Sequence, residues 1–208
     1  MVARIRCMTG REWYERFVAK GPDYRGIRQS GAELQALLLK AGLGAGLPLG
    51  HAQDLSVLAT KLASDPQLLA MAAAALDGPH YRVRLDGTDE HVVVEQGGAL
   101  MTGPILIDAL VAGAKRAVLH RIDWPLLLWP MLAHAREVYG LHVSLETASR
   151  GTVTITVGEA DGLDALGAPQ SVPLDVIERL TGFAAKTYVP ASETSRRSGA
   201  GAGISDND

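Results

Sequence analysis

Between residues 30 and 76, apolar residues recur every three or four positions, the spacing that places side chains on one face of a helix. Ser30 is followed three residues later by Glu33, a pair typical of a helix N-terminus. Asp65 and Pro66 mark a second N-terminus, because aspartate caps helices and proline suits their first turn. This pattern predicts a small helical layer of three helices, over 31–41, 50–63 and 66–76.

From residue 80 the pattern changes to an alternation of apolar and polar residues, which is typical of strands. Two alternating segments, 80–85 and 90–95, flank an Asp-Gly-Thr-Asp sequence that favours a tight turn. We therefore expect a β-hairpin. Pairing across this turn places Val83, Val92 and Val94 on one face and Arg82, Arg84 and His91 on the other.

The middle of the chain alternates between strand and helix patterns. Short apolar strands are predicted at 117–120 and 141–147, and helices at 104–113 and 130–139. A strand–helix–strand order is the signature of parallel crossovers. We therefore expect these two strands and segment 90–95 to be parallel neighbours in one sheet.

The threonine-rich segment 152–158 also alternates, and it is expected to pair antiparallel with 141–147. A loop of odd length, or a bulge near Gly151, places the apolar residues of both strands on the same face. A last helix is predicted over 173–186. Together these elements predict a single α/β (or α+β) domain over 30–186, with a mixed, partly parallel central sheet and an N-terminal helical layer.

The two ends of the chain differ from this domain. Residues 1–29 are rich in arginine, lysine and aromatic residues, and they form an N-terminal extension in our interpretation. The C-terminal tail, residues 187–208, has few large apolar residues, and its composition is typical of a flexible segment. It contains three alternating glycines, Gly199, Gly201 and Gly203.

Composition narrows the class of protein. Hydrophobic residues make up 47% of the chain and charged residues 21%, which is the balance of a folded globule. The net charge of −3 argues against a general nucleic-acid binder. The most apolar stretch is short and interrupted by Pro104 and Asp108, so no membrane span is expected. The lone Cys7 cannot form an internal disulfide, and we expect a cytoplasmic protein.

No sequence motif identifies a reaction. The chain lacks a phosphate-binding loop and a Gly-x-Ser-x-Gly elbow, and its six histidines do not fall at zinc-ligand spacing. The acidic end, Asp206 to Asp208, has oxygens suited to a divalent ion but lacks the rigidity of such a site. We expect no metal and no cofactor, and the sequence leaves open whether the protein is an enzyme.

The predicted α/β fold still indicates where a ligand would bind. Open α/β sheets bind ligands beyond the carboxyl ends of their parallel strands. Gln96, His120, Arg121 and Asp123 follow two of these strands, and His120 and Asp123 are the candidate catalytic residues. Each has a structural alternative, because an aspartate often caps a helix and an isolated histidine is commonly structural. The helix predicted to start near Thr102 to Pro104 would add free backbone N–H groups for an anion.

The polar face of the predicted hairpin is a second candidate. Arg82, Arg84 and His91 carry the donors that bind a carboxylate or a phosphate. The alternative is an ordinary solvated face.

Two stretches resemble a bacterial family known only as a domain of unknown function. They are AGLGAGLPLGHAQD at 41–54 and TYVPASETSRRSGAGAGISDND at 187–208, of which the second is the more specific. The resemblance implies no activity, but it implies that the C-terminal tail matters.

Three hypotheses follow. The first is a small enzyme or catalytic subunit that binds a small anionic metabolite, with the tail folded over the strand ends as a lid. The second is a non-catalytic subunit whose tail inserts into a partner or a second copy, so that a homo-oligomer or hetero-complex is expected. The third is a plain ligand-binding module. In the first, the tail brings hydroxyls, a guanidinium and glycine amides to the anion, from Ser192, Ser195, Arg196, Gly199, Gly201 and Gly203.

Overall fold

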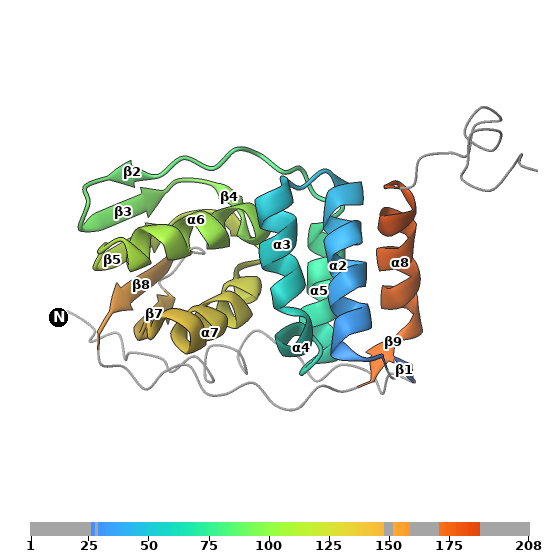
Figure 1. The fold of residues 1–208 in the computed structure, drawn as a ribbon. Coiled ribbons are helices and arrows are strands. Elements are labelled where there is room, and N and C mark those ends of the chain that lie inside the picture. The colour runs from blue at the N-terminus through green and yellow to red at the C-terminus, as the bar shows by residue number, and fades with distance from the viewer. Residues whose placement is uncertain (1–25, 28, 148–151, 159–170, 188–208) are drawn as a thin grey trace, which may run out of the picture.

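The computed structural model describes residues 26–27, 29–147, 152–158 and 171–187. The expectations for the N-terminal extension and for residues 188–208 lie outside this part of the chain. Helices and one small sheet form one half of the molecule, and a larger sheet with two helices forms the other (Figure 1).

The helical half confirms the predicted N-terminal layer and adds the last helix to it (Figure 1). It contains α2 (Gly31–Ala45), α3 (Leu49–Val57), α4 (Ala59–Leu62), α5 (Pro66–Ala75) and α8 (Leu174–Ala185). At its base β1 (Gly26–Ile27) pairs antiparallel with β9 (Val172–Pro173).

Both predicted caps are present. The backbone N–H of Glu33 donates to Ser30 Oγ at 3.2 Å, and Ser30 N–H donates to Glu33 Oε2 at 2.9 Å. The Gln67 N–H donates to Asp65 Oδ1 at 2.7 Å at the start of α5. These contacts are local, so the sequence was enough to locate them.

Two helix boundaries differ from the prediction. α2 runs on to Ala45 and ends at Gly46, whose left-handed backbone (φ 92°) closes the helix. The predicted helix over 50–63 is two helices, α3 and α4, separated at Leu58.

The other half contains a five-stranded mixed sheet, which confirms the predicted α/β class. Its order is β2-β3-β5-β8-β7, with β3 parallel to β5 and β8 antiparallel to both of its neighbours. The strands are β2 (Asp86–Gly87), β3 (His91–Val94), β5 (Arg116–Leu119), β8 (Val153–Val157) and β7 (Val143–Thr147). The expectation that β7 neighbours β5 was wrong, because β8 folds back between them.

The first hairpin is shorter than predicted. Residues 80–85 are not a strand, and Asp86 and Gly87, expected in the turn, form β2 instead. The turn lies at Asp89 and Glu90, closed by Thr88 N–H to His91 O at 2.8 Å. The Thr88 hydroxyl also accepts from the His91 N–H at 3.1 Å, which favours this later turn.

The β7–β8 pairing has the predicted direction but a different register. Val143 lies opposite Val157 and Leu145 opposite Ile155. The alternation in the sequence instead aligned Val143 with Ile155 and Leu145 with Val153, two residues away. Because the shift is even, the same apolar side chains still share the buried face.

Two helices, α6 (Ala99–Val111) and α7 (Leu128–Tyr139), cover one face of the sheet (Figure 1). The short helix η1 (Pro125–Leu127) directly precedes α7. α6 begins at Ala99, so Pro104 lies inside it and the predicted start was wrong. Likewise, Pro130 lies in the first turn of α7, where its missing N–H costs little. Within the described ranges, no helix combines the length and apolarity needed to cross a membrane.

Candidate functional site

The parallel pair β3 and β5 ends at the junction with the helical half (Figure 1). Beyond it, β4 (Gly97–Gly98) pairs with β6 (Ile122–Asp123) at the same offset, so one parallel ladder continues across a short interruption. The interruption holds Gln96, His120 and Arg121, which the structure therefore brings together as expected. His120 Nδ1 lies 3.2 Å from Thr152 Oγ1, and Arg121 Nε donates to the Glu95 carbonyl at 3.3 Å.

The backbone at these strand ends adopts a conformation that side chains disfavour. Arg121 (φ 46°) and Trp124 (φ 57°) are the non-glycine residues with positive φ in the described part of the chain. Such residues concentrate at functional sites. Trp124, not Asp123, occupies the cap position of η1, and no side chain caps that helix. Asp123 is exposed in β6, so its N-cap alternative was wrong.

The expected anion site at Thr102 to Pro104 is not formed, because the first turn of α6 lies earlier. Ala99, Leu100 and Met101 are buried in that turn. The Thr102 Oγ1 atom is buried and has no hydrogen-bond partner among the described residues. A Cβ atom on Gly97 would lie 2.6 Å from it, so β4 packs directly against the helix.

Arg82, Arg84 and His91 are all exposed. Arg84 Nε lies 2.8 Å from Asp86 Oδ1, so part of its charge is already matched. Residues 80–85 do not join the sheet, and hence no common strand face aligns the three side chains. Their anion-binding role stays a prediction. The tail residues of the lid hypothesis lie outside the described ranges.

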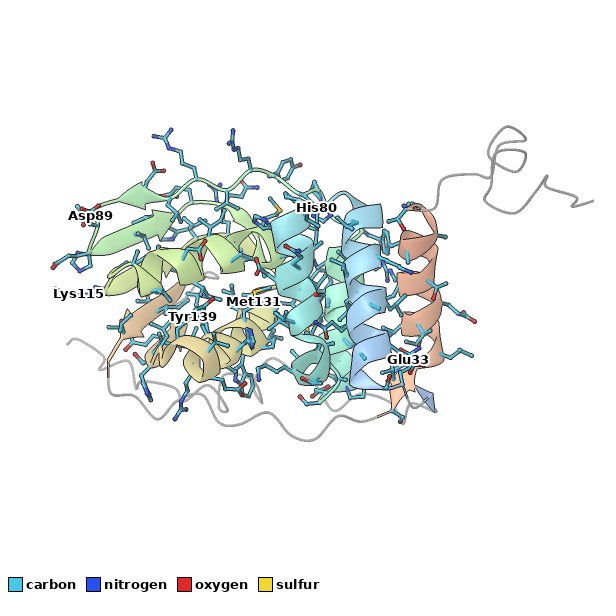
Figure 2. All side chains as sticks on the ribbon, viewed as in Figure 1. Glu33, His80, Asp89, Lys115, Met131 and Tyr139 are labelled. Carbon is cyan, nitrogen blue, oxygen red and sulfur yellow. The ribbon has the colours of Figure 1, made fainter. Side chains whose placement is uncertain are left out.

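A site that the sequence analysis missed lies between α3, α6 and α7. These helices enclose a cavity of about 80 Å³, and Met131 and Tyr139 on α7 border it (Figure 2). Each helix contributes residues three or four positions apart. The lining residues are Asp54, Val57, Leu58, Pro104, Ile107, Asp108, Met131, His134, Ala135 and Tyr139.

The cavity combines an apolar floor with charged groups. Leu58, Met131 and Ala135 are buried, whereas Asp54 and Asp108 are exposed at the mouth. Asp54 is exposed overall, but the helices packed around its carboxyl group partly desolvate it, and this desolvation raises its pKa. His51 and His134 oppose the change, and the negative charge of Asp108 adds to it.

The histidine in this cavity shifts in the other direction. Burial lowers the pKa of His134, and the positive charge of Lys61 lowers it further, while Glu137 and Asp54 oppose the change. Lys61 Nζ lies 2.6 Å from Glu137 Oε2, an ion pair that joins α4 to α7 beside the cavity. The neutral form of His134 is thus favoured at neutral pH, and in this form one ring nitrogen donates a hydrogen bond while the other can accept a proton.

His51 adds a further potential metal ligand beside the cavity. His51 lies one helical turn before Asp54, and its buried Nε2 has no hydrogen-bond partner among the residues that the structure describes. Within those same residues, no cluster of three or more His, Cys, Asp or Glu side chains has an arrangement able to hold a metal ion. We call the cavity lined by Asp54, Asp108 and His134 the acid–base pocket.

A weak sequence signal marked one member of the acid–base pocket. Asp108 interrupts the most apolar stretch of the chain, a feature that served only to exclude a membrane span. Asp54 and His134 lie inside helical segments far away in sequence, with no motif linking the three.

No protein-family model, no curated protein and no solved structure matches this chain. The resemblance of residues 41–54 and 187–208 to an uncharacterised bacterial family accordingly stays a prediction.

Proposed function

We propose that this protein acts on a small molecule by proton transfer in the acid–base pocket, with His134 as the proton-exchanging group and Asp54 as the carboxylate that assists it. The observation that supports this most is the convergence of two carboxylates and one imidazole, from three helices, on one cavity. Desolvation raises the pKa of Asp54 and lowers the pKa of His134. Titratable groups perturbed in this way cluster at sites of general acid–base chemistry.

The charges favour a ligand with a cationic group, such as an ammonium. Asp54 and Asp108 are both carboxylates, and His134 is neutral at neutral pH. A cation at the mouth of the pocket gains from both carboxylates, whereas an anion is repelled by them. A cavity of about 80 Å³ has room for only a few atoms, so it holds one end of a substrate.

The two groups have complementary roles in this proposal. His134, neutral and partly desolvated, accepts a proton from the substrate. The Asp54 carboxylate stabilises the imidazolium that forms, and the imidazolium then returns its proton to another atom of the substrate. Removal and return of a proton is the chemistry of an isomerisation, and no net change of charge or redox state is required.

The test is an NMR titration of the full-length chain with methylammonium, followed at the His134 ring and the Asp54 carboxyl. A ligand of two non-hydrogen atoms gains at most about 3 kcal/mol, so the expected Kd is on the order of 10 mM or weaker. Bound methylammonium should lower the pKa of Asp54, because a nearby cation stabilises the carboxylate. Acetate, the matched anion, should leave both signals in place.

Asp54→Asn should abolish the methylammonium response, and Glu178→Gln on the exposed side of α8 should preserve it. Equal responses to methylammonium and acetate, or a response that survives Asp54→Asn, would contradict the proposed ligand chemistry. We also propose a cytoplasmic location, because a chain with one cysteine has no internal disulfide that would require an oxidising compartment.

The strand ends support a second candidate, the binding of a small anionic metabolite. The observation in its favour is the pair of left-handed residues, Arg121 and Trp124, beside His120. Backbone strain of this kind costs about 1 kcal/mol or more per residue and persists where function requires it. The guanidinium of Arg121 is exposed and offers a planar set of donors to a carboxylate or phosphate.

A further inference from the structure

β7 is the last strand of the five-stranded sheet, at its edge next to α7 (Figure 1). It pairs with β8 on one side only. On its other side, no strand of the described ranges pairs with it. An edge strand of this kind presents unpaired backbone N–H and C=O groups to the surroundings.

The hydrogen bonds show which residues of β7 present these groups. Gly158 N–H donates to the His142 carbonyl at 3.1 Å, so the backbone of residue 142 is directed toward β8. Backbone direction alternates along an antiparallel strand. Ser144 and Glu146 are therefore also directed toward β8, and Val143, Leu145 and Thr147 direct their backbone groups outward.

The sequence of this edge lacks several residues that discourage strands from pairing. Residues 141–147 contain no lysine, no proline and no glycine. The side chains of Val143 and Leu145 are buried in the hydrophobic core, which anchors this strand to the body of the protein. Its polar face carries His142, Ser144 and Glu146, of which His142 is exposed and the other two are half-buried.

We propose that β7 pairs antiparallel with β7 of a second copy, which joins the two sheets into one of ten strands. The pairing is centred on Ser144, so that Val143 of each copy lies opposite Leu145 of the other. The same register places His142 opposite Glu146 twice, once on each side of the two-fold axis.

Side-chain complementarity selects this register, because the His142 imidazole can donate a hydrogen bond to the Glu146 carboxylate. A centre on Val143 or on Leu145 also satisfies the backbone groups, but it sets Ser144 opposite His142 or Glu146 and leaves the other without this partner. With the centre on Ser144, Val143 and Leu145 exchange backbone hydrogen bonds. His142 and Glu146 then occupy non-hydrogen-bonded positions, where side chains approach most closely.

Disulfide trapping tests the register in chains with Cys7→Ser, which removes the native thiol. Ser144→Cys places two cysteines opposite each other, about 4.5 Å apart between Cα atoms, within reach of a disulfide. Glu146→Cys is the matched control on the same strand face, with its two copies about 13 Å apart along the strands. Mild oxidation should yield a covalent dimer of the first variant and not of the second.

Light scattering after size exclusion tests the association without cysteines. The wild-type chain should dimerise, and His142→Glu should raise the dimer Kd about tenfold or more, because it sets like charges opposite each other. Adding Glu146→Lys to that variant should restore the dimer. Circular dichroism checks that each variant is folded. A wild-type monomer at every concentration, equal trapping of both cysteine variants, or a dimer that ignores the charge reversal would overturn the proposal.

Discussion

At the scale of single residues, the acid–base pocket is defined by a carboxylate in an unfavourable position. Asp54 lies beside the apolar side chains of Leu58 and Met131 and near a second carboxylate, Asp108. Both surroundings disfavour its charge. A residue kept in such a position reduces stability at neutral pH, which is a common property of functional sites.

Asp54→Asn should therefore stabilise the fold, and more so at pH 7 than at about pH 4. A raised pKa means that the folded state binds this proton more tightly than the unfolded state. Stability from Asp54 is accordingly present at low pH and is lost as the pH rises through the raised pKa. Denaturant unfolding at the two pH values measures the difference. Glu178→Gln, at an exposed position of α8, is the control variant. An Asp54→Asn variant that is less stable than the wild type at pH 7 would contradict this prediction.

At the scale of secondary-structure elements, the glycine-rich end of α2 allows this helix to pack closely against α8. A Cβ atom on Gly44 would overlap the carbonyl group of Phe183 in α8, so the two helix backbones touch at this point. Gly46 then ends α2 in the left-handed conformation. Gly44 and Gly46 thus serve helix packing and helix termination.

Gly44→Ala should destabilise the protein by about 2 kcal/mol or more, because backbone atoms cannot move aside as a flexible side chain can. Gly182→Ala in α8 is the matched control. No atom lies within 4 Å of its added Cβ, and alanine favours a helix over glycine by up to about 1 kcal/mol. Chemical denaturation should show opposite signs for the two substitutions. Equal effects would mean that α2 and α8 do not pack through Gly44.

At the scale of the whole molecule, both candidate sites lie where the two halves meet. α3 belongs to the helical half, whereas α6 and α7 cover the sheet, and the acid–base pocket lies among the three (Figure 1). The ends of β3 and β5 reach the same junction. One continuous hydrophobic core, from Leu34 to Phe183, joins the halves and holds the junction in place.

Removing residues 191–208 should leave the thermal midpoint nearly unchanged, since the segment has few large apolar residues and the core of the described chain ends before it. If the tail acts as a lid over the strand ends, the deletion should also weaken phosphate or citrate binding near Arg121. Calorimetry and a phosphate titration measure the two effects. Arg196→Ala is the milder variant. Unchanged anion binding after the deletion would leave the tail without a role at this site.

The sequence by itself determined the features that depend on neighbours along the chain. Ser30 with Glu33 and Asp65 with Gln67 form their caps within one helical turn, and alternation predicted strands β3, β7 and β8. These interactions join residues a few positions apart, so a pattern read along the chain contains them.

The tertiary structure alone decided which elements lie side by side. The insertion of β8 between β5 and β7, the start of α6 at Ala99, and the meeting of Asp54, Asp108 and His134 were not predicted. Each depends on contacts between segments that are distant in sequence, where periodicity carries no information about the neighbour. A carboxylate on one helix has the same local sequence whether it faces water or an imidazole on another helix, and only packing distinguishes the two.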